Sequence, residues 1–147
     1  MTSLRDRLRE DLISARKARD PALTLVLGTT LADVENHQLA TPTPLADAAV
    51  VEVLRRAVKR RRESEEAYRR ADRPLLAERE RIEGAVLTRY LPAEASEDEL
   101  RSAVRAAVNG GATSIGVVMS RVMPMFKGRA DGAVLNRLAR EEFGLDS

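Results

Sequence analysis

Apolar residues recur every three or four positions along most of the chain, which is the spacing of an amphipathic helix. At the start, for example, Leu4, Leu8, Leu12 and Ala15 share one helical face. The same spacing predicts seven helices, which begin at or near Ser3, Asp20, Leu45, Pro74, Ser96, Thr113 or Ser114, and Asp131. No stretch alternates apolar and polar residues as a strand would. The pattern therefore predicts an all-α protein.

Prolines and glycines mark the ends of these helices and divide the chain. Two prolines within Thr41–Pro44 exclude a helix interior, so this segment is predicted to be a loop. Gly110–Gly111 is typical of a helix C-terminus, and Pro92 stops the fourth helix. We expect two lobes, with four helices in residues 1–91 and a three-helix tail in residues 95–147.

The composition restricts the chemistry. The chain has no cysteine, which excludes disulfides, thiolate nucleophiles and cysteine-ligated metals. The single histidine, His37, lies near the end of the second predicted helix, where the helix dipole favours it. No neighbouring residues complete a catalytic triad or a metal site with it. We therefore expect no catalytic residue, no metal and no cofactor.

The polarity of the chain also bears on its location. No apolar run approaches the roughly 20 residues that a membrane span needs. The polar start Met1–Ser3 is followed by charged residues, so no secretory signal is expected. These features predict a cytoplasmic protein without a membrane partner.

Charged residues make up 33% of the chain, but the formal net charge is only +2, so their placement matters more than their balance. Many carboxylates lie within helical reach of a cation, as Arg62 with Glu66 and Glu65 with Arg69 do. The run Lys59–Arg62 covers a full helical turn, and internal pairing cannot satisfy all of it. This run is either a solubilising face or a contact for a polyanion.

A second group of cations lies in the tail and comprises Arg121, Lys127, Arg129, Arg137 and Arg140. Gly128 suits the left-handed exit from the sixth helix, and Asp131 suits the cap of the seventh. The corner is either a plain connection between helices or a phosphate site, built from helix-terminal amides beside Lys127 and Arg129. The spacing alone leaves both interpretations open.

Four segments match the residue pattern of a known protein family, in the same order along the chain. They are Leu4–Leu12, Lys59–Ser64 with Tyr68, Tyr90–Pro92, and Met119–Gly132. In the last one, Gly128-Arg129-Ala130-Asp131-Gly132 is followed by Asn136 and preceded by Gly116. Together these segments resemble the GatB/YqeY family, over the whole chain. One departure is Thr41–Pro44, a proline-rich version of a loop that is usually more charged in that family.

The resemblance implies a helical N-terminal lobe and a three-helix tail lobe. In that family the tail is shared with the B subunit of the tRNA-dependent amidotransferase, where it contacts the bound tRNA. Stand-alone members lack the large catalytic domain of that subunit. The family label of carbon–nitrogen ligase with glutamine as amido donor descends from the shared tail, and this chain shows none of the machinery for that reaction.

From the residues and the resemblance we expect a non-catalytic protein that binds folded RNA, with tRNA as the first candidate. Arg121, Lys127 and Arg129 would contact phosphates, and Arg137 and Arg140 would steer the RNA from outside. The expected RNA-binding residues are Arg121, Lys127, Gly128, Arg129, Asp131, Gly132, Asn136, Arg137 and Arg140. A secondary basic patch comprises Lys59, Arg60, Arg61 and Arg62.

Two alternatives remain open from the sequence. The mixed-sign third and fourth helices suit an adaptor that binds an amidotransferase or another translation protein. The family label would instead make the chain an amidotransferase accessory or enzyme, although no triad, metal site or nucleotide loop is visible.

Overall fold

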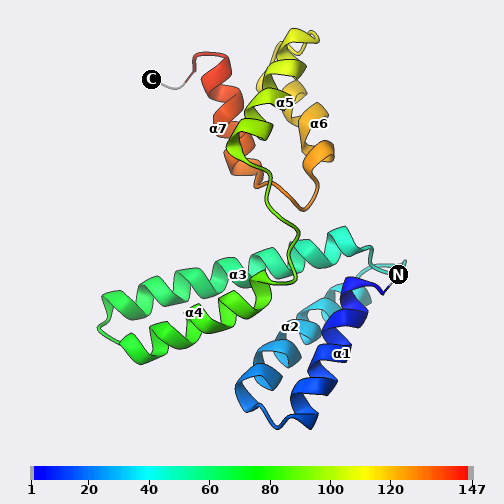
Figure 1. The fold of residues 1–147 in the computed structure, drawn as a ribbon. Coiled ribbons are helices and arrows are strands. Elements are labelled where there is room, and N and C mark those ends of the chain that lie inside the picture. Colours follow the sequence, from blue (N-terminus) through cyan, green and yellow to red (C-terminus); the bar gives the residue numbers. More distant parts are fainter. Residues whose placement is uncertain (1, 146–147) are drawn as a thin grey trace. The chain divides into compact units, whose positions relative to one another are not determined.

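The computed structural model of the protein describes residues 2–145. Within these residues the chain forms helices and no strand, which confirms the all-α prediction (Figure 1). The elements in chain order are α1 (Leu4–Lys17), α2 (Pro21–Leu39), α3 (Asp47–Arg70), α4 (Pro74–Thr88), α5 (Glu97–Asn109), α6 (Ile115–Val122), the 3-10 helix η1 (Met123–Phe126) and α7 (Gly132–Glu142). By its internal contacts the chain divides into two compact units, Met1–Leu91 and Pro92–Ser147.

Capping residues begin most of the helices as the sequence predicts. Backbone amides in the first turns donate to the side-chain oxygens of Ser3, Asp20, Ser96, Ser114 and Asp131. Ser114 is therefore the cap of α6, and Thr113 is not. The third helix begins at Asp47 rather than Leu45. The Asp47 carboxylate accepts a hydrogen bond from the amide of Leu4 at 3.0 Å, so α3 caps the start of α1.

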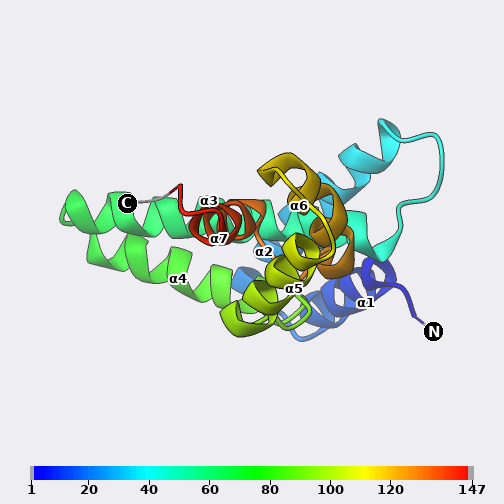
Figure 2. The ribbon, with the colours of Figure 1, turned by 90° about the horizontal axis from the view of Figure 1, so that it is seen from above.

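The core of the N-terminal unit is built from α1, α2, the first half of α3 and the end of α4. The predicted apolar stripes supply its fully buried side chains, which include Leu8, Leu27, Val34, Leu54 and Leu87. Burying each such side chain stabilises the fold by roughly 1.5–3 kcal/mol. α3 and α4 run side by side in both views (Figures 1 and 2).

Ion pairs replace apolar contacts in the second half of the α3–α4 hairpin. Arg61 of α3 pairs with Glu83 of α4, and its guanidinium lies 3.6 Å from Glu80. The predicted pair of Glu65 and Arg69 is confirmed, with 3.7 Å between their charged atoms. This half of the hairpin is therefore held by charge rather than by a hydrophobic core.

The spacing of apolar residues in the fourth helix also predicts that Leu75, Leu76 and Ile82 face a core, and this prediction is wrong. These side chains are exposed, Leu75 by as much as 86%. The face of α4 that meets α3 carries small residues instead, with Ala77 fully buried and Gly84 beside Arg61. Because α3 presents charged side chains here, it offers no apolar surface that could cover the leucines.

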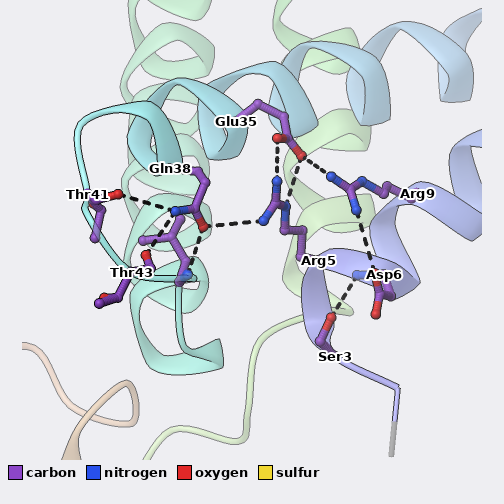
Figure 3. Close-up of polar contacts among 9 residues, drawn as sticks. Ser3, Arg5, Asp6, Arg9, Glu35, Gln38, Thr41 and Thr43 are labelled. Carbon is purple, nitrogen blue, oxygen red and sulfur yellow. Dashed lines mark hydrogen bonds and ion pairs between the residues drawn. The ribbon is translucent and has the colours of Figure 1, made fainter.

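Gln38 fixes the proline-rich loop between α2 and α3 (Figure 3). Its amide nitrogen donates to the carbonyl oxygens of Thr43 at 2.9 Å and Thr41 at 3.4 Å. Its amide oxygen accepts from the backbone of Leu45 at 2.8 Å and from Arg5 of α1 at 3.3 Å. One side chain thus supplies hydrogen-bond partners for the backbone of a loop in which two prolines lack amide donors.

The C-terminal unit has a core of its own. Its buried side chains come from α5, α6, η1 and α7, and include Leu100, Val104, Val118, Leu135 and Leu138. The sequence places the end of the sixth helix at Pro124 and Gly128, but the structure ends α6 at Val122. Met123–Phe126 then forms η1, which carries Phe126 into the core.

Candidate nucleic-acid interface

The corner between η1 and α7 has the local geometry that its sequence predicts. Gly128 has φ +76°, a left-handed conformation that favours glycine. The Asp131 carboxylate accepts a hydrogen bond from the amide of Ala133 at 2.9 Å. The capping carboxylate therefore takes one of the α7 amides that a phosphate at this corner would need.

Arg129 ties several parts of the C-terminal unit together. Its Nε donates to the carbonyl oxygen of Ala93 at 3.3 Å, and its Nη2 lies 3.4 Å from a carboxylate oxygen of Glu99. Its guanidinium lies 6.0 Å from the ring centroid of Phe126, and its carbonyl oxygen accepts from the amide of Ala95 at 2.8 Å. Arg129 therefore anchors the start of the unit and shares its charge with Glu99.

Lys127 and Arg121 keep their charges available. Both side chains are exposed. Lys127 makes no hydrogen bond or ion pair with any residue that the structure describes. Arg121 donates to the carbonyl oxygen of Gly110 at 3.2 Å, which orients the guanidinium without neutralising it. Of the predicted cations Arg121, Lys127, Arg129 and Arg137, these two are the ones that no described carboxylate neutralises.

Arg137 belongs to a four-residue ion-pair network between α5 and α7. It lies 2.8 Å from Glu141 and 3.2 Å from Glu97, and Arg101 lies 3.0 Å from each of the same carboxylates. The hydrogen bond from Arg101 holds the pKa of Glu141 below its usual range, and the bonds to Glu141 raise the pKa of Arg101 and Arg137. The charge of Arg137 is thus matched within the unit.

The remaining predicted residues of α7 lie one turn apart at Gly132, Asn136 and Arg140. A Cβ at Gly132 would lie 3.6 Å from the Met123 methyl carbon, an ordinary van der Waals distance, so packing against η1 does not require glycine here. Asn136 is half-buried and Arg140 is exposed.

Basic and acidic residues are divided unevenly between the two units. Residues 1–91 hold 18 Lys and Arg against 15 Asp and Glu, whereas residues 92–147 hold 7 against 8. The excess of positive charge therefore belongs to the N-terminal unit. This makes the basic patch on α3 a stronger candidate for contact with a polyanion.

Two residues of that patch, Arg60 and Arg61, already form ion pairs with carboxylates. Arg61 faces α4 and pairs with Glu83, and its Nε is buried without a partner in the described residues. The guanidinium of Arg60 lies 3.1 Å from the carboxylate of Asp33 on α2. Both residues therefore help to hold α3 against its neighbours.

Three cations on α3 have no partner among the described residues. The side chains of Arg56, Lys59 and Arg62 are exposed and make no hydrogen bond or ion pair there. The predicted pair of Arg62 with Glu66 does not form. The three residues follow one another at intervals of one helical turn, so their donors are presented along one stretch of α3.

The sequence contains a signal for the inward position of Arg61, but none for the contacts of Arg129. Arg61 follows the buried Leu54 and Ala57 at helical spacing, so it lies on the face of α3 that turns inward. The partners of Arg129 lie about thirty positions earlier in the chain, and only the folded tail brings them together.

The comparison with known proteins identifies the family. A model of the family described as Yqey-like protein matches residues 5–143. The chain belongs to the YqeY-like family. A relative of this YqeY-like chain in Pyrenophora tritici-repentis, named altered inheritance of mitochondria protein 41, mitochondrial, is 31% identical over 94% of this chain and 80% of its own length.

A second relative is an uncharacterized protein of Schizosaccharomyces pombe, which is 29% identical over 60% of this chain and 72% of its own length. In the described part of the YqeY-like chain, no helix is long and apolar enough to cross a membrane. Nor does any group of three or more acidic or histidine side chains there have the arrangement of a metal site.

Proposed function

We propose that this YqeY-like protein binds folded RNA, with tRNA as the first candidate. The observation that carries the proposal is the set of three exposed, unpaired cations on α3: Arg56, Lys59 and Arg62. An unpaired cation can neutralise a phosphate and release its counterion, whereas a cation already paired with a carboxylate gains little from doing so. The resemblance of the tail to a tRNA-contacting domain supports RNA as the polyanion.

The aromatic side chains favour contacts with phosphates over stacking on bases. The chain has four aromatic residues, and none of them is among its exposed side chains: Phe126 is buried, and Tyr68, Tyr90 and Phe143 are half-buried. Proteins that read single-stranded bases usually stack them on exposed aromatics. Recognition by shape and charge therefore fits this molecule better.

The tail contributes a second set of contacts in this proposal. Arg121 and Lys127 are its free cations, while Arg129 is committed in part to Glu99 and Ala93. Reversing the charge of Arg129 would therefore damage the fold of the unit as well as any RNA contact. Arg121 and Lys127 are the cleaner residues to change.

A tRNA titration at several salt concentrations tests the proposal. We expect Lys59→Glu with Arg62→Glu to weaken binding about tenfold or more, and to lower the salt slope by about one per contact removed. Arg121→Glu with Lys127→Glu should do the same for the tail. The matched control is Arg16→Glu with Lys17→Glu, which changes the net charge equally at the end of α1.

The possible outcomes distinguish a wrongly assigned binding patch from a wrongly proposed function. Unchanged binding in either pair of variants would remove that patch from the interface. Equal weakening in the control would show that only net charge matters, and no tRNA binding by the unaltered protein at low salt would reject the proposed function.

A protein-binding adaptor is the second candidate, and one surface feature favours it. An apolar groove of about 530 Å³ lies between α2 and α4, and Leu25 and Leu75 in it are 58% and 86% exposed. Exposed apolar patches of this kind often mark protein contacts. A protein that is captured from lysate after nuclease treatment, and lost on Leu25→Ser with Leu75→Ser, would support this function.

A further inference from the structure

A cleft of about 440 Å³ opens in the N-terminal unit where α1, the α1–α2 turn and the end of α4 meet. Its apolar wall is formed by Ala15, Leu23, Leu27 and Val86. Its polar wall includes Arg7, Asp11, Arg89 and Tyr90. Its size falls within the range of roughly 300–1,000 Å³ that is usual for small-molecule sites. Neither RNA-binding patch contributes a residue to it.

Tyr90 contacts two oppositely charged side chains of α1 that do not form an ion pair with each other. Arg7 and Asp11 are four positions apart on α1, where opposite charges commonly form an ion pair. Instead, the Tyr90 hydroxyl donates to the Asp11 carboxylate, and the Arg7 guanidinium lies 5.3 Å from the centroid of the Tyr90 ring. No ion pair joins Arg7 to Asp11. Arg7 thus lines the cleft without a hydrogen-bond or ion-pair partner among the described residues.

The formal charges in the cleft balance, with Arg7 and Arg89 against Asp11 and Asp20, but neither arginine is paired with a described carboxylate. Asp20 is occupied as the cap of α2, where its carboxylate accepts from the Leu23 amide at 3.0 Å. Arg89 has no ion pair with the described residues. Burial and the bond to Asp11 raise the pKa of Tyr90, so the phenol remains a neutral donor. Two guanidinium groups thus stand beside an apolar wall without carboxylate partners.

We propose that this cleft binds a small organic anion that combines an apolar, planar body with one carboxylate, sulfonate or phosphate group. The body would lie against Leu23, Leu27 and Val86, and the anionic group would accept hydrogen bonds from Arg7 and Arg89. Tyr90 is the positioning residue, because it keeps Asp11 away from Arg7. The proposal does not depend on RNA binding.

Anilinonaphthalene sulfonate is a suitable fluorescent probe, since it has both chemical features. We expect it to bind the folded full-length chain, and Arg7→Gln with Arg89→Gln to weaken that binding about tenfold. Ser14→Trp, at an exposed position of the cleft wall, should block binding by filling the space. The matched control is Arg16→Gln with Lys17→Gln, on the same helix but outside the cleft, which should bind as the unaltered protein does.

The role of Tyr90 has a separate readout. In Tyr90→Phe the Asp11 carboxylate loses its donor and becomes free to pair with Arg7, so the probe should bind about tenfold more weakly. Adding Asp11→Asn should restore binding, because no carboxylate then competes for Arg7. A merely structural role for Tyr90 would leave the double variant as weak as the single one. Far-UV circular dichroism and the thermal midpoint establish that each variant is folded.

Competition experiments decide the ligand class. Naphthalene sulfonate should displace the probe, whereas sulfate alone and neutral naphthol should each compete at least about tenfold less well. Equal competition by sulfate or by naphthol would overturn the proposal, as would equal probe binding in all the variants. Displacement by tRNA would assign the cleft to RNA instead. The α3 variant Lys59→Glu with Arg62→Glu should bind the probe normally, so failure of the RNA proposal and failure of this one are distinguishable.

Discussion

Glu35 on α2 receives two arginines from α1 (Figure 3). Arg5 donates to both of its carboxylate oxygens, with one bond at 2.9 Å, and Arg9 adds a third bond at 2.8 Å. The hydrogen bond from Arg5 is the main reason that the pKa of Glu35 lies below its ordinary value of 4.5, and Arg9 lowers it further. This cluster joins the first two helices at a partly exposed site.

Glu35→Gln should destabilise the protein by about 0.5–1 kcal/mol at neutral pH, the range for a partly exposed ion pair. Because the folded pKa is lowered, the contribution of Glu35 is complete above the unfolded pKa near 4.5 and is lost as pH falls below it. Urea unfolding at pH 7 and pH 3 measures this, and the difference between the two proteins should shrink at pH 3. Glu10→Gln on α1 is the control, and a pH-independent difference would contradict the assignment.

Residue type alone does not distinguish Arg61, Arg129 and Lys127, since each is a cation with other basic residues nearby. In the structure Arg61 holds α4 and Arg129 anchors the tail, while Lys127 remains free. What distinguishes them is the distance to a carboxylate on another element. Residue type alone does not contain that information.

At the scale of elements, α4 shows how a helix is shaped by what lies opposite it. Gly84 sits in its interior on the face toward α3, but a Cβ there would come no closer than 3.9 Å to the Arg61 side chain. There is thus room for alanine at a position where glycine costs backbone entropy.

Gly84→Ala should raise the free energy of unfolding by about 0.5–1 kcal/mol, because it restores helix propensity without a clash. The opposite is expected for Gly128→Ala, which must hold a left-handed φ of +76° and should lose about 1–2 kcal/mol. Thermal or urea unfolding measures both. Destabilisation by Gly84→Ala would show that α3 and α4 need to approach more closely than this spacing indicates.

For the whole molecule, the two units have separate cores. Every buried residue of the tail core lies between Leu100 and Ala139, and the hydrogen bond from Ala95 to Arg129 closes the unit from within. None of these contacts requires residues 1–91. The tail is therefore expected to fold without the N-terminal unit.

A fragment of residues 92–147 should be helical by circular dichroism and should unfold in one cooperative thermal transition. Leu138→Ala, which opens a cavity in its core, should cost about 2–5 kcal/mol and unfold most of so small a unit. If the fragment is disordered even without this substitution, the tail depends on the rest of the chain for its fold.

The sequence by itself determined the helices, most of their caps, the apolar stripes of the two cores and the family. These features are local, because a cap such as Ser96 and a stripe such as Leu4, Leu8 and Leu12 act within a few residues of themselves. Only the tertiary structure decided which cations are free, which leucines of α4 stay exposed, and that Asp11 accepts a hydrogen bond from Tyr90. Those outcomes depend on groups that are distant in the chain, such as Tyr90 and Asp11, meeting at hydrogen-bond range.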